Sequence, residues 1–75
     1  MTGLNILEGM TMNIVTVKVS VEFVKGGGAL FYKTSQARHN WTNKKAIDVF
    51  SRQAFQKYAN AGIDVKRITC AIVTA

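Results

Sequence analysis

The chain has 75 residues, and its ten lysines and arginines outnumber its four aspartates and glutamates, giving a formal net charge of +6. Apolar residues make up 48% of the sequence and charged residues 19%, which is typical of a globular chain and excludes a disordered one. We expect a single domain over residues 1–75. The lone cysteine, Cys70, excludes an internal disulfide, and with one histidine, His39, a zinc site of four Cys and His ligands is also excluded.

The sequence also bears on where the protein works. No apolar run approaches the roughly 18 residues that a membrane-spanning helix needs. Residues 1–9 have no basic residue ahead of their apolar part, so they do not resemble a secretory signal. A lone thiol fits a reducing compartment. We therefore expect a cytoplasmic protein that does not contact a membrane.

The first elements of the chain differ in how clearly they can be recognised. Residues 1–12 have the weakest pattern and are expected to form a tail or a short extra strand. Met10 and Met12 follow Met1 closely, so the natural start of the protein stays open. Residues 13–25 alternate valine or phenylalanine with polar side chains, which predicts a strand with one buried and one wet face.

A hairpin is expected next. Glycines 26–28 can adopt positive φ without strain and so predict a turn between two strands. The following run, residues 29–37, should return antiparallel to the first strand. One alternate set of its side chains contains Phe31 and the other contains Tyr32, so the sequence leaves open which set faces the core.

An amphipathic helix is predicted from Thr42 or Asn43, either of which can cap it, to about Ala61, with Gly62 as a left-handed cap. Apolar residues recur at helical spacing and should form its buried stripe: Ile47, Phe50, Ala54, Tyr58 and Ala61. The opposite, wet side should carry Lys45, Asp48, Arg52, Gln56 and Asn60.

The last run, residues 65–74, predicts a third strand. The complete order predicts an α+β fold: a three-stranded, mainly antiparallel sheet in β-β-α-β order, with the helix packed on one face. We favour the strand order 2-1-3 over a right-handed crossover that would place strand three beside strand two. Strand three is partly apolar on both faces, and one helix covers only one of them. Either residues 1–12 or a second copy of the chain, in a homodimer, should cover the other.

Catalytic signatures are missing, and we expect a protein that is not an enzyme and binds no metal or cofactor. His39 falls in a polar loop, while Glu22 and Asp48 fall on wet faces of different elements, so paired catalytic groups are not expected. Cys70 has no neighbouring cation to lower its pKa. The triple glycine joins two strands rather than a strand and a helix, which is not the setting of a phosphate-binding loop.

One segment, residues 38–45, combines basic, aromatic and amide side chains just before the helix. Lysines in a first helical turn oppose the helix dipole, and free backbone N–H groups there attract anions. Trp41 could stack on a nucleic-acid base, or it could pack as a hydrophobic staple against Ala46 or Ile47. The predicted anion-binding or nucleic-acid-binding residues are Arg38, His39, Trp41, Lys44 and Lys45.

Further basic contacts are predicted at Lys25, Lys33, Lys66 and Arg67. The sequence thus predicts a small basic binding module that contacts nucleic acid or another polyanion through the 38–45 segment. The alternative is a small interaction or inhibitor protein, of the kind that phages and mobile elements encode, which docks through a sheet edge or face on a larger acidic protein.

Overall fold

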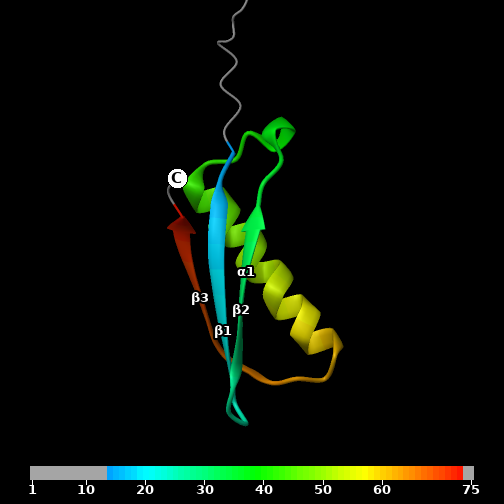
Figure 1. Ribbon diagram of the computed structural model, residues 1–75. Coiled ribbons are helices and arrows are strands. Elements are labelled where there is room, and N and C mark those ends of the chain that lie inside the picture. Colours follow the sequence, from blue (N-terminus) through cyan, green and yellow to red (C-terminus); the bar gives the residue numbers. More distant parts are fainter. Residues whose placement is uncertain (1–13, 74–75) are drawn as a thin grey trace, which may run out of the picture.

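A computed structural model describes residues 14–73 (Figure 1). Its elements in chain order are β1 (Thr16–Phe23), β2 (Gly28–Thr34), a 3-10 turn η1 (Ala37–His39), α1 (Asn43–Asn60) and β3 (Val65–Val73). The tail or extra strand expected in residues 1–12 lies outside the described residues.

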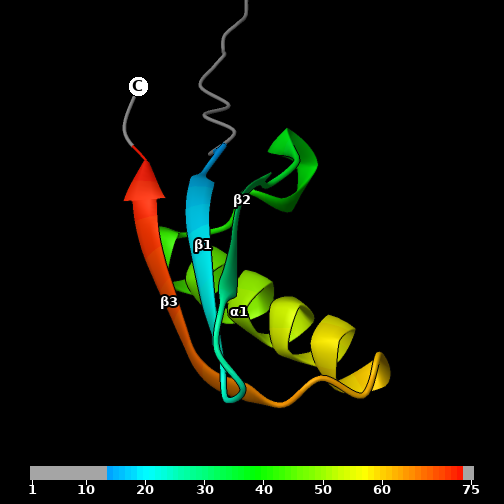
Figure 2. The ribbon, with the colours of Figure 1, turned by 60° about the horizontal axis from the view of Figure 1, so that its bottom comes forward.

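The three strands form one sheet in the order β2-β1-β3, and β1 pairs antiparallel with both neighbours. Figures 1 and 2 show α1 packed on one face of this sheet. The predicted α+β fold, the single packed helix and the strand order 2-1-3 are therefore confirmed. No element among residues 14–73 covers the opposite face, which we call the open face.

Two hydrogen bonds at the ends of the hairpin show which way the backbone N–H and C=O groups of β1 point. The N–H of Phe23 donates to the carbonyl of Gly27 at 3.1 Å, and the N–H of Ser35 donates to the carbonyl of Val15 at 2.9 Å. Hydrogen-bonded pairs recur at every second residue of an antiparallel ladder. Odd-numbered residues of β1 therefore turn their N–H and C=O groups toward β2, and its even-numbered residues turn theirs toward β3.

A small core lies between α1 and the sheet. Its buried apolar residues come from β1, the segment before it, and α1: Val15, Val17, Val19, Val21, Ala46, Phe50 and Ala54. Ala29 and Phe31 pack against this core, whereas Leu30 and Tyr32 are 60% and 58% exposed. The facing of β2, which its sequence left open, is thus settled by its register with β1, since Phe31 lies opposite the buried Val19.

Both ends of α1 agree with the sequence. Thr42 is the N-cap, and its Oγ1 accepts a hydrogen bond from the N–H of Lys45 at 3.1 Å. At the other end Gly62 has φ of +76°, and the N–H groups of Gly62 and Ile63 bond back to carbonyls of the last turn, as in a Schellman motif. The expectation that Ala61 belongs to the buried stripe is wrong: the helix ends at Asn60, and Ala61 is exposed in the turn.

Candidate polyanion-binding site

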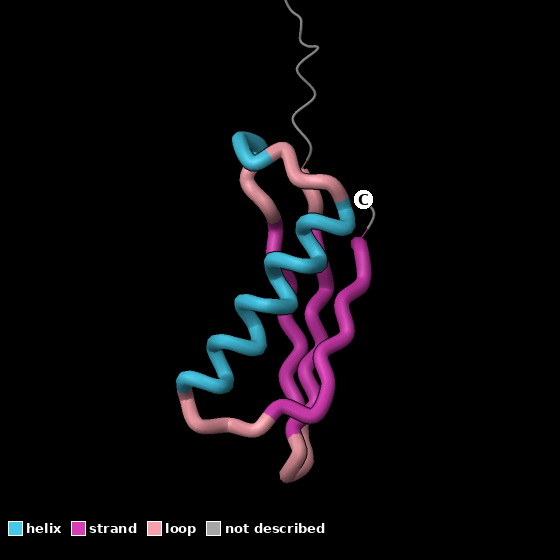
Figure 3. The backbone as a smooth tube through the Cα atoms, turned by 180° about the vertical axis from the view of Figure 1, so that it is seen from behind, coloured by secondary structure: helices cyan, strands magenta, loops and turns pink. Residues whose placement is uncertain are grey.

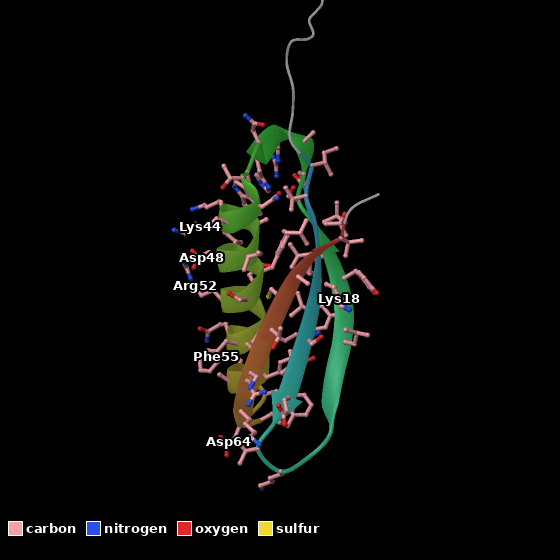
Figure 4. All side chains as sticks on the ribbon, turned by 90° about the vertical axis from the view of Figure 1, so that its left-hand side faces the viewer. Lys18, Lys44, Asp48, Arg52, Phe55 and Asp64 are labelled. Carbon is pink, nitrogen blue, oxygen red and sulfur yellow. The ribbon has the colours of Figure 1, made fainter. Side chains whose placement is uncertain are left out.

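The predicted 38–45 segment runs from η1 into the first turn of α1, at the end of the sheet where β2 finishes (Figure 1). We call this end of the molecule the basic end, defined by Lys33, Arg38, Lys44 and Lys45. All four side chains are exposed. Figure 4 shows Lys44 near the start of α1.

Trp41 links this end to the core. Its ring is stacked on the ring of His39, with centroids 4.2 Å apart and planes at 12°. It also meets Phe50 edge-on, with centroids 5.7 Å apart. Trp41 is half-buried and packs against the core, whereas His39 is exposed. One face of the indole is therefore covered by His39, whose own ring is exposed.

The backbone explains how His39 comes to lie over Trp41. Asn40, between them, has φ of +49°, in the left-handed region that asparagine tolerates better than most residues. Its N–H donates to the carbonyl of Ala37 at 3.1 Å and closes the 3-10 turn. This reversal places the two rings face to face within a very short segment.

The charge at the start of α1 is unusual for a helix. Lys44 and Lys45 occupy its first turn, which contains no acidic residue. Cations there are disfavoured by the helix dipole, whose positive end attracts anions. Arg38 is exposed, and its Nε donates to Oε1 of Gln36 at 2.5 Å. The basic end thus concentrates positive charge, and none of its four cations forms an ion pair with a carboxylate of residues 14–73.

The remaining predicted contacts lie elsewhere. Lys25 is in the hairpin at the opposite end of the sheet (Figure 1). Lys66 and Arg67 are at the start of β3, where their side-chain nitrogens lie 3.6 and 3.8 Å from the carboxylate of Glu22. Within one chain, Lys33 therefore lies at the same end of the sheet as the 38–45 residues, and Lys25, Lys66 and Arg67 lie at the other end.

Ion pairing divides the cations into two groups. Arg52 pairs with Asp48, and Lys66 and Arg67 pair with Glu22. Within residues 14–73, no ion pair is formed by Lys18, Lys25, Lys33, Arg38, Lys44, Lys45 or Lys57. The whole basic end belongs to this second group, so its charge is not neutralised by neighbouring side chains.

Lys57, which was not among the predicted contacts, extends this surface, whereas Tyr32 does not. Lys57 lies over the ring of Phe31 at 5.4 Å, and together with Lys33 it lines a 270 Å³ groove between α1 and β2. Tyr32 lies on the open face, directly opposite Lys18 in the register of β1 and β2. Neighbouring strand residues point to opposite faces, and the register with β1 decides that Lys33 faces α1 and Tyr32 the open face, which the sequence alone left open.

Catalytic equipment is sparse in the part of the chain that the structure describes. Burial raises the pKa of the Cys70 thiol above its ordinary value, which disfavours the reactive thiolate. Among the same residues, no group of three or more Asp, Glu, His and Cys side chains is placed to hold a metal ion. No helix in residues 14–73 is both long enough and apolar enough to cross a membrane.

Comparisons of the chain with protein families, with curated proteins and with solved structures found no match.

Proposed function

We propose that this protein is a small binding module that contacts a polyanion, the phosphate backbone of a nucleic acid, through its basic end. The observation that carries the proposal is the set of four exposed cations, Lys33, Arg38, Lys44 and Lys45, which form no ion pair within residues 14–73. Phosphate contacts of this kind dominate the affinity of most nucleic-acid-binding proteins. The backbone N–H groups at the start of α1 also favour the binding of an anion there.

The energetic cost of this arrangement supports the proposal. Two lysines in the first turn of α1 oppose the helix dipole, and acidic residues at the same positions would stabilise the helix. A binding partner with negative charge would convert this unfavourable arrangement into a favourable one. The exposed ring of His39, backed by Trp41, adds an aromatic surface on which an unpaired base could stack.

The proposal is tested by titrating labelled single-stranded RNA and duplex DNA with the protein at several salt concentrations. Lys44→Glu/Lys45→Glu should weaken binding strongly and lower the slope of log K against log salt by about two, because two phosphate contacts are lost. The matched control is Lys18→Glu/Lys25→Glu, which changes the net charge equally but away from the basic end. Equal losses in the two variants would contradict a contact at the basic end.

The alternative function, docking on an acidic protein, is favoured by a different observation: no strand among residues 14–73 pairs with the outer edge of β3. Capture of partners from cells before and after nuclease treatment separates the two functions. Partners that survive digestion would favour the acidic protein. Partners that disappear on digestion would favour nucleic acid.

A further inference from the structure

The β3 strand leaves an unusually accessible edge. Among residues 14–73 it is an outer strand of the sheet, with β1 as its only neighbour. Because even-numbered residues of β1 bond to β3, the odd-numbered residues of β3 from Arg67 onward turn toward β1. Ile68, Cys70 and Ile72 therefore turn their N–H and C=O groups away from the sheet, along a free edge.

Beyond its first residues, this edge lacks the features that usually protect outer strands. Natural sheets block an edge with charged residues, proline or a bulge. All the protection on β3 is at its start, where Lys66 and Arg67 lie and where the register shift opposite Glu22 and Phe23 makes Lys66 the extra residue of a bulge. From Ile68 to Val73 the strand has no charged residue and no proline.

We propose that this edge pairs with the same edge of a second copy, so that two sheets join antiparallel into one. Centring the pairing on Cys70 gives the longest overlap of the regular edge, with Ile68 opposite the partner's Ile72 and Thr69 opposite the partner's Ala71. Arg67 then lies opposite the uncharged Val73 of the partner. No two like charges lie directly opposite each other between Arg67 and Val73, and the resulting interface is a closed two-fold contact that cannot extend into fibres.

The tilt of α1 supports a copy of this chain as the occupant. Figures 1–3 show that α1 begins near the end of β3 and inclines away from it. A groove of about 450 Å³ is left beside the start of β3. Its lining combines the apolar Phe55, Val65 and Ile68 with Ser51 and four charged residues: Asp48, Arg52, Lys66 and Arg67. Phe55 is 52% exposed, and Figure 4, which looks onto this edge, shows it on α1 in line with Asp48 and Arg52.

Antiparallel pairing covers this groove with the matching part of the partner. The partner's β3 runs in the opposite direction, so its end, with the beginning of its own α1, lies beside the groove. The two-fold axis repeats this fit on the other side. The small core gives a reason for the association, because domains of this size without a disulfide or metal often gain stability by forming oligomers.

The pairing is tested with two engineered chains, both carrying Cys70→Ser: one with Thr69→Cys and the other with Ala71→Cys. Both positions are exposed on the open face. In the proposed register they form a pair without cross-strand hydrogen bonds, whose Cα atoms are about 4.5 Å apart, within the range that a disulfide spans. Oxidation should therefore cross-link the mixture into dimers and leave each variant alone monomeric on a non-reducing gel.

Other cross-linking patterns would overturn the proposal. Dimers of the Thr69→Cys chain alone would place the axis at residue 69, and dimers of the Ala71→Cys chain alone would place it at residue 71. The absence of a cross-link in every sample, together with a monomer mass for the unmodified chain in sedimentation equilibrium, would show that the edge does not pair with a second copy. None of these outcomes depends on nucleic-acid binding, so failure here is distinguishable from failure of the proposed function.

Discussion

Trp41 shows how one residue joins the candidate site to the core. Its indole is held between the exposed His39 and the buried Phe50. A change at Trp41 should therefore affect stability as well as binding, whereas a change at His39 should affect mainly the exposed surface. Lone tryptophans are often core residues, and here the same ring also supports the outermost aromatic group of the site.

Trp41→Ala should lower the free energy of unfolding by about 2–3 kcal/mol, less than the loss for a fully buried tryptophan because Trp41 is half-buried. His39→Ala should cost about 1 kcal/mol or less, since it removes only one stacked pair. Urea unfolding followed by circular dichroism measures both. An unchanged midpoint for Trp41→Ala would show that the indole is not packed on the core.

Sequence reasoning reached the residues of the site but could not choose between their roles. It offered base stacking and core packing for Trp41, and the choice depends on the left-handed turn at Asn40, which no periodic pattern reveals. The core packing is observed, although the expected staple contacts were Ala46 or Ile47 and the ring partners are His39 and Phe50. A role for these residues in binding remains a prediction.

At the scale of elements, local patterns were sufficient wherever one face is buried and the other is wet. The alternation in β1 and the helical spacing in α1 fixed both elements within a few residues, because each pattern reflects a single buried face. The two faces of β2 are both apolar in sequence, so only pairing with β1 could orient it. In the first turn of α1 the sequence has two lysines, although acidic residues there would make the helix more stable.

Replacing Lys45 by glutamate should therefore stabilise the protein by about 0.3–1 kcal/mol at low salt, because a carboxylate favours the positive end of the helix dipole. Asp48 lies three residues after Lys45, and like charges at this spacing repel, so the gain should fall near the lower end of this range. Urea unfolding at low and at roughly 1 M salt measures the effect, which should vanish when charges are screened. A gain that persists at high salt would point to a different cause.

At the scale of the whole molecule, the pairing of two β3 edges would change the charge distribution. In one chain, Lys66 and Arg67 lie at the opposite end of the sheet from Lys44 and Lys45. In the antiparallel pair, Arg67 lies opposite the partner's Val73, at the end of the partner where its α1 begins. The basic end of each chain would therefore gain two further cations from the other chain, together with the Glu22 carboxylate with which they pair. This consequence rests on both the proposed pairing and the proposed function.

Disulfide-linked pairs of the Thr69→Cys and Ala71→Cys chains allow this shared surface to be tested. In a trans pair, one chain carries Lys44→Gln/Lys45→Gln and the other carries Lys66→Gln/Arg67→Gln. In a cis pair, all four substitutions are on one chain and the other chain has none. If each site combines cations from both chains, the trans pair keeps one complete site and the cis pair keeps only two half-sites.

Titration with single-stranded RNA at low salt should accordingly show tighter binding by the trans pair, by about three- to tenfold, since the cis pair loses phosphate contacts from both of its sites. Both pairs have the same composition and net charge, so non-specific attraction cannot produce the difference. The opposite order, with the cis pair tighter, would mean that Lys44, Lys45, Lys66 and Arg67 act within one chain. Equal binding would mean that the two groups of cations act independently, and the shared surface would then be wrong even if the edges pair.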